Sequence, residues 1–210
     1  MKGLLQKDLY QIWYYARTIL LASAIIMVVS VAMSGENRSF FMVYASFLIS
    51  MLPMTLLAYD QNSRFADYSV ALPVTKGQLV GCKYLIGLFT MVLADLLAGL
   101  ALAVVWLRGG SVSSEMVFGT LMQVSVMPLL GSAVLLPLTY RFGYEKAKYI
   151  YYLFVGLSAA LMGFGVATDG DLPGLALPAG WAQLGFWLVC LVLYAVSWRL
   201  SIAWYGKAEQ

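Results

Sequence analysis

The 210-residue chain contains no histidine, and this absence removes a large group of functions. Ser/His proteolysis, bis-histidine haem binding and the H-E-x-x-H metalloprotease motif all require that residue. Cysteine is almost as scarce, since Cys82 and Cys190 stand far apart and no C-x-x-C spacing occurs. The sequence therefore offers neither a thiol redox site nor a zinc site, and we expect two unpaired thiols.

Charge is the next shortage. Charged residues make up 11% of the chain and hydrophobic residues 62%, whereas a soluble domain carries about 25% charged residues. A core of this size cannot hide so much apolar surface from water, so the composition indicates a polytopic membrane protein. The net charge of +3 is small, and the basic residues are nowhere dense enough for nucleic acid.

Long apolar runs organise the chain into what we predict is a single transmembrane domain over residues 1–210. The fold class that they indicate is an all-α polytopic membrane protein with six transmembrane helices. Pro53 lies inside the second run and should kink it, with Thr55 or neighbouring helices satisfying freed backbone groups. The six predicted spans cover residues 18–34, 40–59, 84–107, 116–139, 149–167 and 181–203.

The basic residues are distributed unevenly between the two sides of these six spans. One side holds the N-terminus, the 60–85 and 140–148 loops and the C-terminal end, with eleven of the thirteen Lys and Arg residues. The opposite side holds the other two, Arg38 and Arg108. Because cytoplasmic loops carry the excess of positive charge, we predict that both termini are cytoplasmic.

Residues 2–17 precede the first span and have an amphipathic pattern. Aromatic residues and charges accompany the apolar positions, as suits the headgroup level of a membrane. We predict an interfacial helix there, although this stretch could instead be the start of the first span. The apolar positions at helical spacing are Leu5, Leu9, Ile12, Trp13 and Ala16. Of these, we expect Leu5, Leu9 and Trp13 to contact the membrane.

The longest polar stretch of the chain, Asp60–Leu85, connects the second and third spans, and we call it the docking segment. A bare connection needs about 2–8 residues, so its length and its mixture of aromatic and charged residues favour docking on a partner protein. Leu72-Pro73 should divide a docking helix, about 62–72, from a lead-in to the third span, with Thr75 as N-cap. The predicted contact residues are Arg64, Phe65, Asp67 and Tyr68.

Asp95 is the one acid well inside a predicted span. It lies roughly 16 Å along the third span and so near the middle of the membrane. An acid there indicates either a proton site or substrate path, or a polar contact between helices. Candidate partners for such a contact on the fourth span are Gln123, Ser125 and Ser132.

Enzyme signatures are missing from the sequence. Neither G-x-S-x-G nor the P-loop pattern G-x-x-x-x-G-K-[ST] occurs, and both are needed for the chemistries that they name. We therefore predict that the chain is not an enzyme and binds no cofactor. If ATP drives this protein, another chain must hydrolyse it.

Three stretches carry a resemblance to a known family: MKGLLQKDLYQIW at the start, FADYSVALPVTKGQLVGCKYL in the docking segment and YRFGYEKAKYIYY after the fourth span. Their order and their placement among six spans resemble small ABC-2 type transporter permeases of the Firmicutes sort, which include the phenol-soluble modulin exporters. The likeness extends over nearly the whole chain.

The resemblance implies a permease that pairs with a second copy or a paralogue in the bacterial cytoplasmic membrane. Each permease would bind one ABC ATPase subunit, which would hold ATP and Mg²⁺. The N-terminal helix would be a connecting helix, and residues 62–72 would be the coupling helix that rests in a cleft of the ATPase. The implied activity is ATP-driven export of an amphipathic peptide, antimicrobial or lipid-like molecule.

Two other functions stay open. The chain could be a proton-coupled secondary transporter that uses Asp95, although such transporters usually carry paired charges and broken, repeated helices. It could also be an immunity or sensor-like membrane protein that binds a toxin without moving it. Transport without ATP would indicate the first, and substrate-dependent ATP turnover in a complex would exclude the second.

Overall fold

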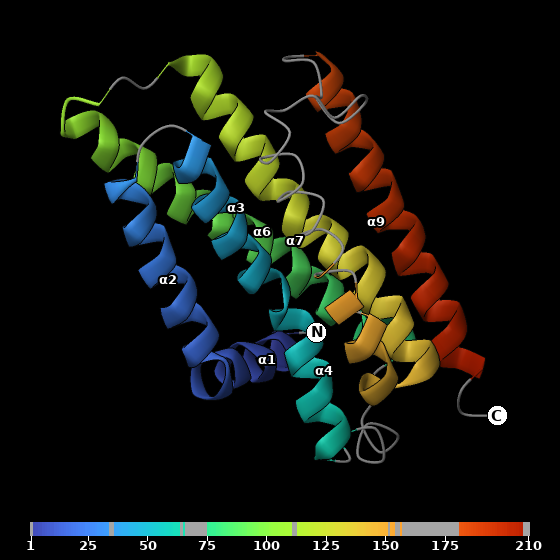
Figure 1. The fold of residues 1–210 in the computed structure, drawn as a ribbon. Helices are drawn as coiled ribbons and strands as arrows, with labels where there is room; N and C mark the ends of the chain where they lie inside the picture. Colours follow the sequence, from blue (N-terminus) through green and yellow to red (C-terminus); the bar gives the residue numbers. More distant parts are fainter. Residues whose placement is uncertain are drawn as a thin grey trace.

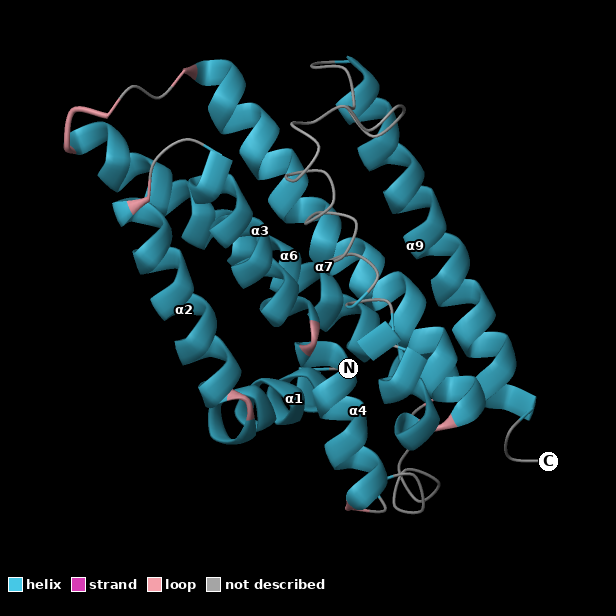
Figure 2. Cartoon of the chain, in the orientation of Figure 1, coloured by secondary structure: helices cyan, strands magenta, loops and turns pink. Residues whose placement is uncertain are grey.

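The computed structural model describes residues 2–33, 36–63, 65, 75–110, 113–150, 152–153, 156 and 181–207. Within those ranges the backbone forms helices and turns without a strand, which confirms the predicted all-α class (Figure 2). The helices are α1 (Lys2–Tyr15), α2 (Arg17–Ala32), α3 (Glu36–Ser50), α4 (Leu52–Asn62), α6 (Lys76–Leu107), α7 (Ser114–Phe142) and α9 (Trp181–Lys207). The long helices run alongside one another, and α1 lies across one end of the bundle (Figure 1).

Four helical stretches of the described chain are long and apolar enough to cross a membrane. They correspond to the second, third, fourth and sixth predicted spans and cover Asn37–Asn62, Gly77–Leu107, Ser114–Phe142 and Leu184–Trp204. A fifth is present if α1 and α2 are counted together as one bent span. The remaining predicted span, 149–167, lies almost entirely outside the described residues.

Helices α1 and α2 meet at a bend of 67°. Ala16 stands between them and is 1% exposed, so the bend packs against the rest of the protein. Hydrogen bonds continue through it, since the Ala16 amide donates to the carbonyl of Ile12 and the Leu20 amide to the carbonyl of Ala16. The small side chain of Ala16 therefore lets the chain turn without opening a gap.

The second apolar run is interrupted between α3 and α4, beside Pro53. Met51 forms the turn between the helices, and Pro53 lies in the first turn of α4, where its missing amide costs no helical hydrogen bond. The Thr55 hydroxyl donates to the Met51 carbonyl at 3.0 Å. The helix is thus interrupted at Met51, next to the predicted kink at Pro53. The Met51 carbonyl also accepts from the Thr55 amide, so the Thr55 hydroxyl bonds at the interruption without replacing the missing Pro53 amide.

Helix α6 starts with a capping box. The Thr75 side chain accepts from the Gln78 amide, and the Gln78 side chain accepts from the Thr75 amide, so two backbone donors are satisfied. Thr75 is thus the N-cap that the sequence predicts. The helix has 32 residues and is about 48 Å long at 1.5 Å per residue. It exceeds the roughly 30 Å hydrocarbon core and includes the end of the docking segment.

Helix α7 crosses the bundle in one piece despite two internal prolines, Pro128 and Pro137, both of which are buried. It begins after the N-cap Ser113 and ends at Gly143, whose φ of +80° suits glycine. Helical residues 144–150 follow directly. The predicted charged loop at 140–148 is therefore one tight turn between helical segments.

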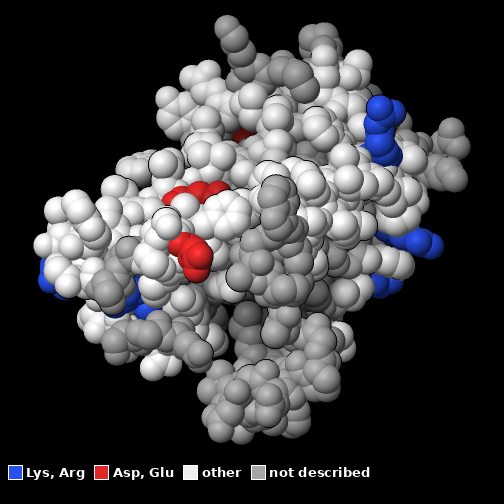
Figure 3. All heavy atoms as spheres, turned by 90° about the horizontal axis from the view of Figure 1, so that it is seen from above, with Lys and Arg blue, Asp and Glu red and all other residues white. Residues whose placement is uncertain are grey.

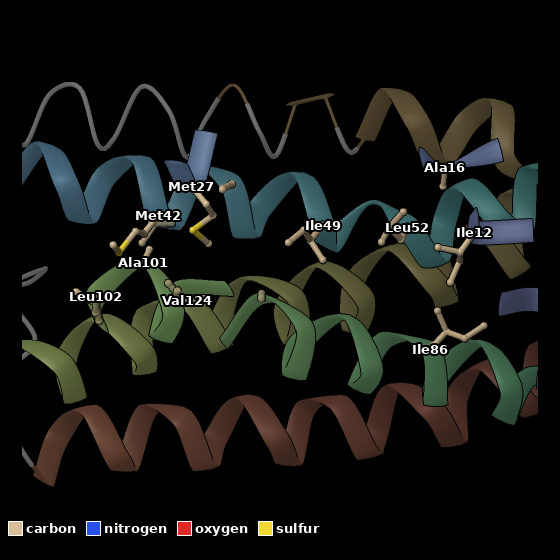
Figure 4. Packing of buried hydrophobic residues seen from close by; sticks show 14 of the residues in the cluster. Ile12, Ala16, Met27, Met42, Ile49, Leu52, Ile86, Ala101, Leu102 and Val124 are labelled. Carbon is tan, nitrogen blue, oxygen red and sulfur yellow. The ribbon is translucent and has the colours of Figure 1, made fainter. Parts of the chain in front are cut away.

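Apolar side chains fill the space between the helices and also cover much of the outside. Figure 4 shows Met27, Met42 and Ile49 pointing into the shared core of α2, α3, α6 and α7. The surface in Figure 3 is mostly uncharged, with a few charged side chains. Such a surface matches lipid rather than water as solvent. Exposed apolar side chains of α2, α6 and α9 include Leu21, Ile25, Val28, Leu96, Leu100, Leu188 and Val192.

Two glycines mark the closest helix approaches. A Cβ added at Gly131 would lie 2.9 Å from Ser50 Oγ, and one at Gly87 would lie 2.6 Å from the Tyr194 hydroxyl. Glycine at these positions lets α7 approach α3, and α6 approach α9. The bundle therefore depends on small residues as much as on large apolar ones.

Candidate functional site

The docking segment leaves α4 and returns through α6 at the same end of the bundle as α1. Among the four predicted contact residues, Phe65 is described and is partly buried. Lys7 Nζ lies 3.6 Å from the centroid of its ring, which is a cation–π contact between α1 and the segment. The predicted docking helix at 62–72 otherwise lies mostly outside the described residues, as do Arg64, Asp67 and Tyr68.

Four charged side chains meet where α1, α4 and α6 converge, and we call them the ionic cluster: Lys7, Asp8, Asp60 and Lys83. Lys83 Nζ lies 2.8 Å from Asp8 Oδ1 and 2.6 Å from Asp60 Oδ2. Lys7 Nζ lies 2.7 Å from Asp60 Oδ1 and 3.3 Å from Asp8 Oδ1. Each carboxylate therefore faces both ammonium groups, and the cluster is neutral as a whole.

Each helix contributes to the ionic cluster at a defined place. Helix α1 supplies neighbouring residues of opposite charge, Lys7 and Asp8. Asp60 lies in the last turn of α4, directly before the docking segment turns away. Lys83 lies in the first third of α6. The ionic cluster thus joins both ends of the docking segment to the N-terminal helix.

Three of the four charged side chains are largely buried, so they lose more hydration energy than the members of a surface ion pair. The side chains of Asp8 and Lys83 are 2% and 6% exposed, and that of Asp60 is 13% exposed. An unpaired charge in such a place costs several kcal/mol of desolvation. The four residues are therefore stable in this place only as a set.

Neighbouring polar contacts extend the ionic cluster along α4. Gln11 Nε2 donates to Asp60 Oδ1 at 3.2 Å, which adds a third contact from α1. The Tyr144 amide donates to Gln61 Oε1 at 3.1 Å. This second bond brings the two charged loops predicted on one side of the membrane, the docking segment and 140–148, into contact.

Glu145 and Lys148, in the helical residues 144–150, form an exposed ion pair that differs from the buried contacts of the ionic cluster. Lys148 donates a hydrogen bond to Glu145 three residues earlier. This hydrogen bond raises the pKa of the Lys148 ammonium. Because water screens the pair, it contributes little to stability, unlike the buried contacts of the ionic cluster.

The predicted membrane contacts of α1 do not share one environment. Leu5 packs against the core together with Ile12, whereas Leu9 is 45% exposed and Trp13 is 76% exposed. The helix therefore has an inner side, which includes the buried Asp8, and an outer aromatic side. Further exposed aromatic residues of α1 are Tyr10, Tyr14 and Tyr15.

Asp95 lies on α6 and contacts α7. Ser125 Oγ is 2.9 Å from each of the two carboxylate oxygens, and it also lies 2.7 Å from the Leu121 carbonyl. Ser125 is one of the three partners that the sequence offered for a contact between helices. The carboxyl group is partly buried in this arrangement.

A buried polar seam holds α6, α7 and α9 together on the other side of α6. The Tyr84 hydroxyl lies 2.7 Å from the hydroxyls of both Ser197 and Ser201. Tyr194 donates to the Tyr84 carbonyl, and Ser197 donates to the Ala133 carbonyl at 2.6 Å. The four hydroxyl groups named here all have partners, so they stabilise the helix packing. Ser132 Oγ, Trp187 Nε1 and Trp198 Nε1 on the same helices are buried without a hydrogen-bond partner in the described part of the chain.

Metal-binding groups are not assembled in the part of the chain that the structure describes. There, His, Cys, Asp and Glu residues form no group of three that could hold an ion. Cys82 and Cys190 are both buried and free.

Sequence reasoning missed the ionic cluster. The amphipathic pattern of residues 2–17 assigned no partner to Lys7 or Asp8, and Asp60 and Lys83 counted only as part of a polar connection. The signal that was present is an acid and a base in each region: Lys7 beside Asp8, and Asp60 and Lys83 near the two ends of the docking segment. A pattern of this kind gives no partner, because the contacts link residues 53 and 75 positions apart.

Comparison with known proteins gives one match. A family model described as ABC-2 family transporter protein matches residues 3–206. No curated protein and no solved structure matches the chain. The matched residues run from the start of α1 to the end of α9 and include the docking segment and the ionic cluster.

Proposed function

The chain belongs to the ABC-2 transporter family and is therefore a membrane permease component of an ABC transporter; from that premise, we propose that it exports an amphipathic peptide, antimicrobial or lipid-like substrate. The energy comes from a separate ABC ATPase subunit, which holds ATP and Mg²⁺. The observation that carries this proposal is the family match over nearly the whole chain. The absence of a P-loop in the sequence supports the separate ATPase.

The ATPase docks on the docking segment in this proposal. The excess of Lys and Arg on this side supports a cytoplasmic position for this end of the bundle and for both termini, where ATP is available. The segment is longer than a connection needs, and its start already contacts α1 through Phe65. Arg64, Asp67 and Tyr68 complete the proposed contact surface.

Helix α1 lies along the cytoplasmic membrane interface in this proposal. Its outer side carries Tyr10, Trp13 and Tyr14, which are 68%, 76% and 73% exposed. Tyrosine and tryptophan are enriched at the headgroup level because one end of each ring system is polar. Its bend of 67° from α2 supports a helix that lies flat while α2 crosses the membrane.

The complete transporter contains a second permease, either a second copy or a paralogue. Substrate passes between the two permeases, and the apolar lining favours an amphipathic cargo over an ion or a sugar. Asp95 in this proposal serves mainly as a polar contact to Ser125, whose hydroxyl lies 2.9 Å from each carboxylate oxygen and can donate its one hydrogen to the carboxylate.

Co-purification with the ABC ATPase subunit of the same organism tests the docking proposal. We expect the wild-type chain to retain the ATPase, and Phe65→Ala, Asp67→Ala and Tyr68→Ala to lose it at least tenfold. Lys146→Ala is the matched control, because Lys146 is exposed on the neighbouring turn at the same end. Full binding and ATP hydrolysis by all three variants would show that the ATPase docks elsewhere.

The proton-coupled alternative makes a different prediction for Asp95. If a proton on this carboxyl group drove transport, Asp95→Asn would abolish it, and a proton gradient would replace ATP. We expect instead that Asp95→Asn keeps the Ser125 contact and keeps ATP-dependent transport in proteoliposomes. Transport that follows the proton gradient without ATP would reject the ABC mechanism.

A further inference from the structure

We propose that the ionic cluster makes α1 and the adjoining ends of α4 and α6 move as one unit, and we call this connection the joint. Its residues Lys7, Asp8, Asp60 and Lys83 are then positioning residues for transport. The inference rests on the proposed function, in which the ATPase displaces the docking segment. It adds the path by which that displacement enters the membrane helices.

The docking segment is attached to α4 and α6 close to two residues of the ionic cluster. Asp60 lies in the last turn of α4, and Lys83 lies in the early part of α6. A force on the segment therefore pulls on both residues. Each of them is held from α1, because Asp60 contacts Lys7 and Lys83 contacts Asp8.

The joint resists separation because of its charge pattern. Positive and negative groups alternate around it, so α4 or α6 moving alone would separate a buried charge from both of its partners. Helix α1 moving alone would break two contacts, Lys7–Asp60 and Asp8–Lys83. Movement of all three helix ends together keeps all four contacts. Two aromatic contacts strengthen the link of α1, namely Lys7 over the Phe65 ring and Tyr15 against Tyr59 with ring centroids 4.5 Å apart.

Helix α1 can carry the movement further into the membrane. Ile12 and Ala16 belong to the same apolar core as Met27 of α2 and Ile86 of α6. The bend at Ala16 joins α1 directly to α2. A displacement of the docking segment thus reaches α2 through the joint and α1, in addition to its direct route through α4 and α6.

Spin-label distances in the reconstituted permease–ATPase complex test the joint. Labels are attached to Gln6→Cys on α1, Ser63→Cys after α4 and Glu115→Cys at the far end of α7, all at exposed positions. The native thiols are first removed as Cys82→Ala and Cys190→Ala. Distances are measured for the pairs 6/63 and 63/115 without nucleotide and with ATP plus vanadate.

We expect the 63/115 distance to shift by a few ångströms, about the size of known helix shifts, while the 6/63 distance stays constant. In Asp60→Leu, which removes the carboxylate that ties α4 to Lys7 and Gln11 of α1, the 6/63 distance should change with nucleotide by a similar amount. Asp60→Glu, which keeps the charge, should restore the constant distance. Lys148→Met, which removes an exposed ion pair, should behave as the wild type.

The outcomes separate the joint from the proposed function. If the ATPase binds and the 63/115 distance responds but 6/63 also changes in the wild type, the joint is wrong and the function stands. A constant 6/63 distance in Asp60→Leu likewise overturns the joint. If no complex forms, or nucleotide leaves both distances unchanged, the proposed function fails and the joint with it. Should Asp60→Leu fold poorly, Asp60→Leu/Lys7→Met keeps the charge balance and takes its place.

Discussion

Replacement of Lys83 by methionine should destabilise the protein more than any change of a surface charge. The substitution keeps most of the side-chain volume and removes the ammonium group that contacts Asp8 and Asp60 at 2.8 and 2.6 Å. Lys7 is then left to neutralise two carboxylates. The ionic cluster changes from neutral to a net charge of −1 in a place that is largely closed to water.

The magnitude follows from the distances and the burial. At an effective dielectric constant of about 20, each contact near 2.7 Å has a gross Coulomb energy of about 6 kcal/mol. Desolvation of the charges offsets most of this gain in the intact cluster. Removal of one partner leaves that desolvation uncompensated and typically costs about 3–5 kcal/mol, a large part of a total stability of about 5–15 kcal/mol.

Unfolding of the purified chain in mixed detergent micelles, followed by helical circular dichroism, measures the loss. Lys83→Met and Asp8→Asn should each lower the free energy of unfolding by about 3–5 kcal/mol. The double variant retains the Lys7–Asp60 pair and is neutral again, so it should be more stable than the sum of the single losses predicts, by about 1–3 kcal/mol. Lys148→Met, which breaks an exposed pair, should cost about 1 kcal/mol or less.

Two results would refute this reasoning. A loss below about 1 kcal/mol for Lys83→Met would mean that the ionic cluster behaves as a solvated surface network. Additive losses in the double variant would mean that Asp8 and Lys83 do not depend on each other. Either result would also remove the physical basis of the joint.

Three further changes test the packing and the caps. Thr75→Ala removes the side-chain cap of α6 and should cost about 1 kcal/mol, seen as faster amide exchange in the first turn of that helix; unchanged exchange would contradict the role of the cap. Gly87→Ala places a Cβ 2.6 Å from a tyrosine hydroxyl of α9 and should lower stability by about 1–3 kcal/mol, whereas Gly99→Ala, which faces open space, should be neutral in the same unfolding assay. Ser125→Ala removes the hydrogen bond to Asp95 and should cost about 0.6 kcal/mol, as such bonds do within membranes; a loss above about 2 kcal/mol would indicate a larger role for this contact.

Local features of the sequence predicted much of the fold. Apolar runs predicted the helical class and the places of the four long spans that the structure describes, because lipid exposure demands a continuous helix of about 20 apolar residues. Pro53 predicted the break between α3 and α4, and Thr75 predicted the start of α6. Each of these effects acts within one or two turns of its own residue. Ser125 was offered as one of three partners for Asp95, and the helix packing decided among them.

The candidate site depended on tertiary structure. The sequence selected the docking segment by its length and polarity, yet it gave no sign that Asp60 and Lys83 contact each other and are both held by α1. It also grouped Leu9 and Trp13 with the inner residues of α1, because helical spacing defines a face but not what covers it. Helix α1 contacts α4 and α6 through Lys7 and Asp8, whereas Leu9 and Trp13 are exposed.

Composition and charge pattern alone indicate a bundle of membrane helices with a long polar segment after the second span. Apolar content and charge distribution are sums over single residues, so they can be read without a structure. The meeting of Lys7, Asp8, Asp60 and Lys83 in one cluster is visible in the folded protein alone. Their contacts depend on the angles at which three helices cross, and no residue of the cluster sets those angles alone.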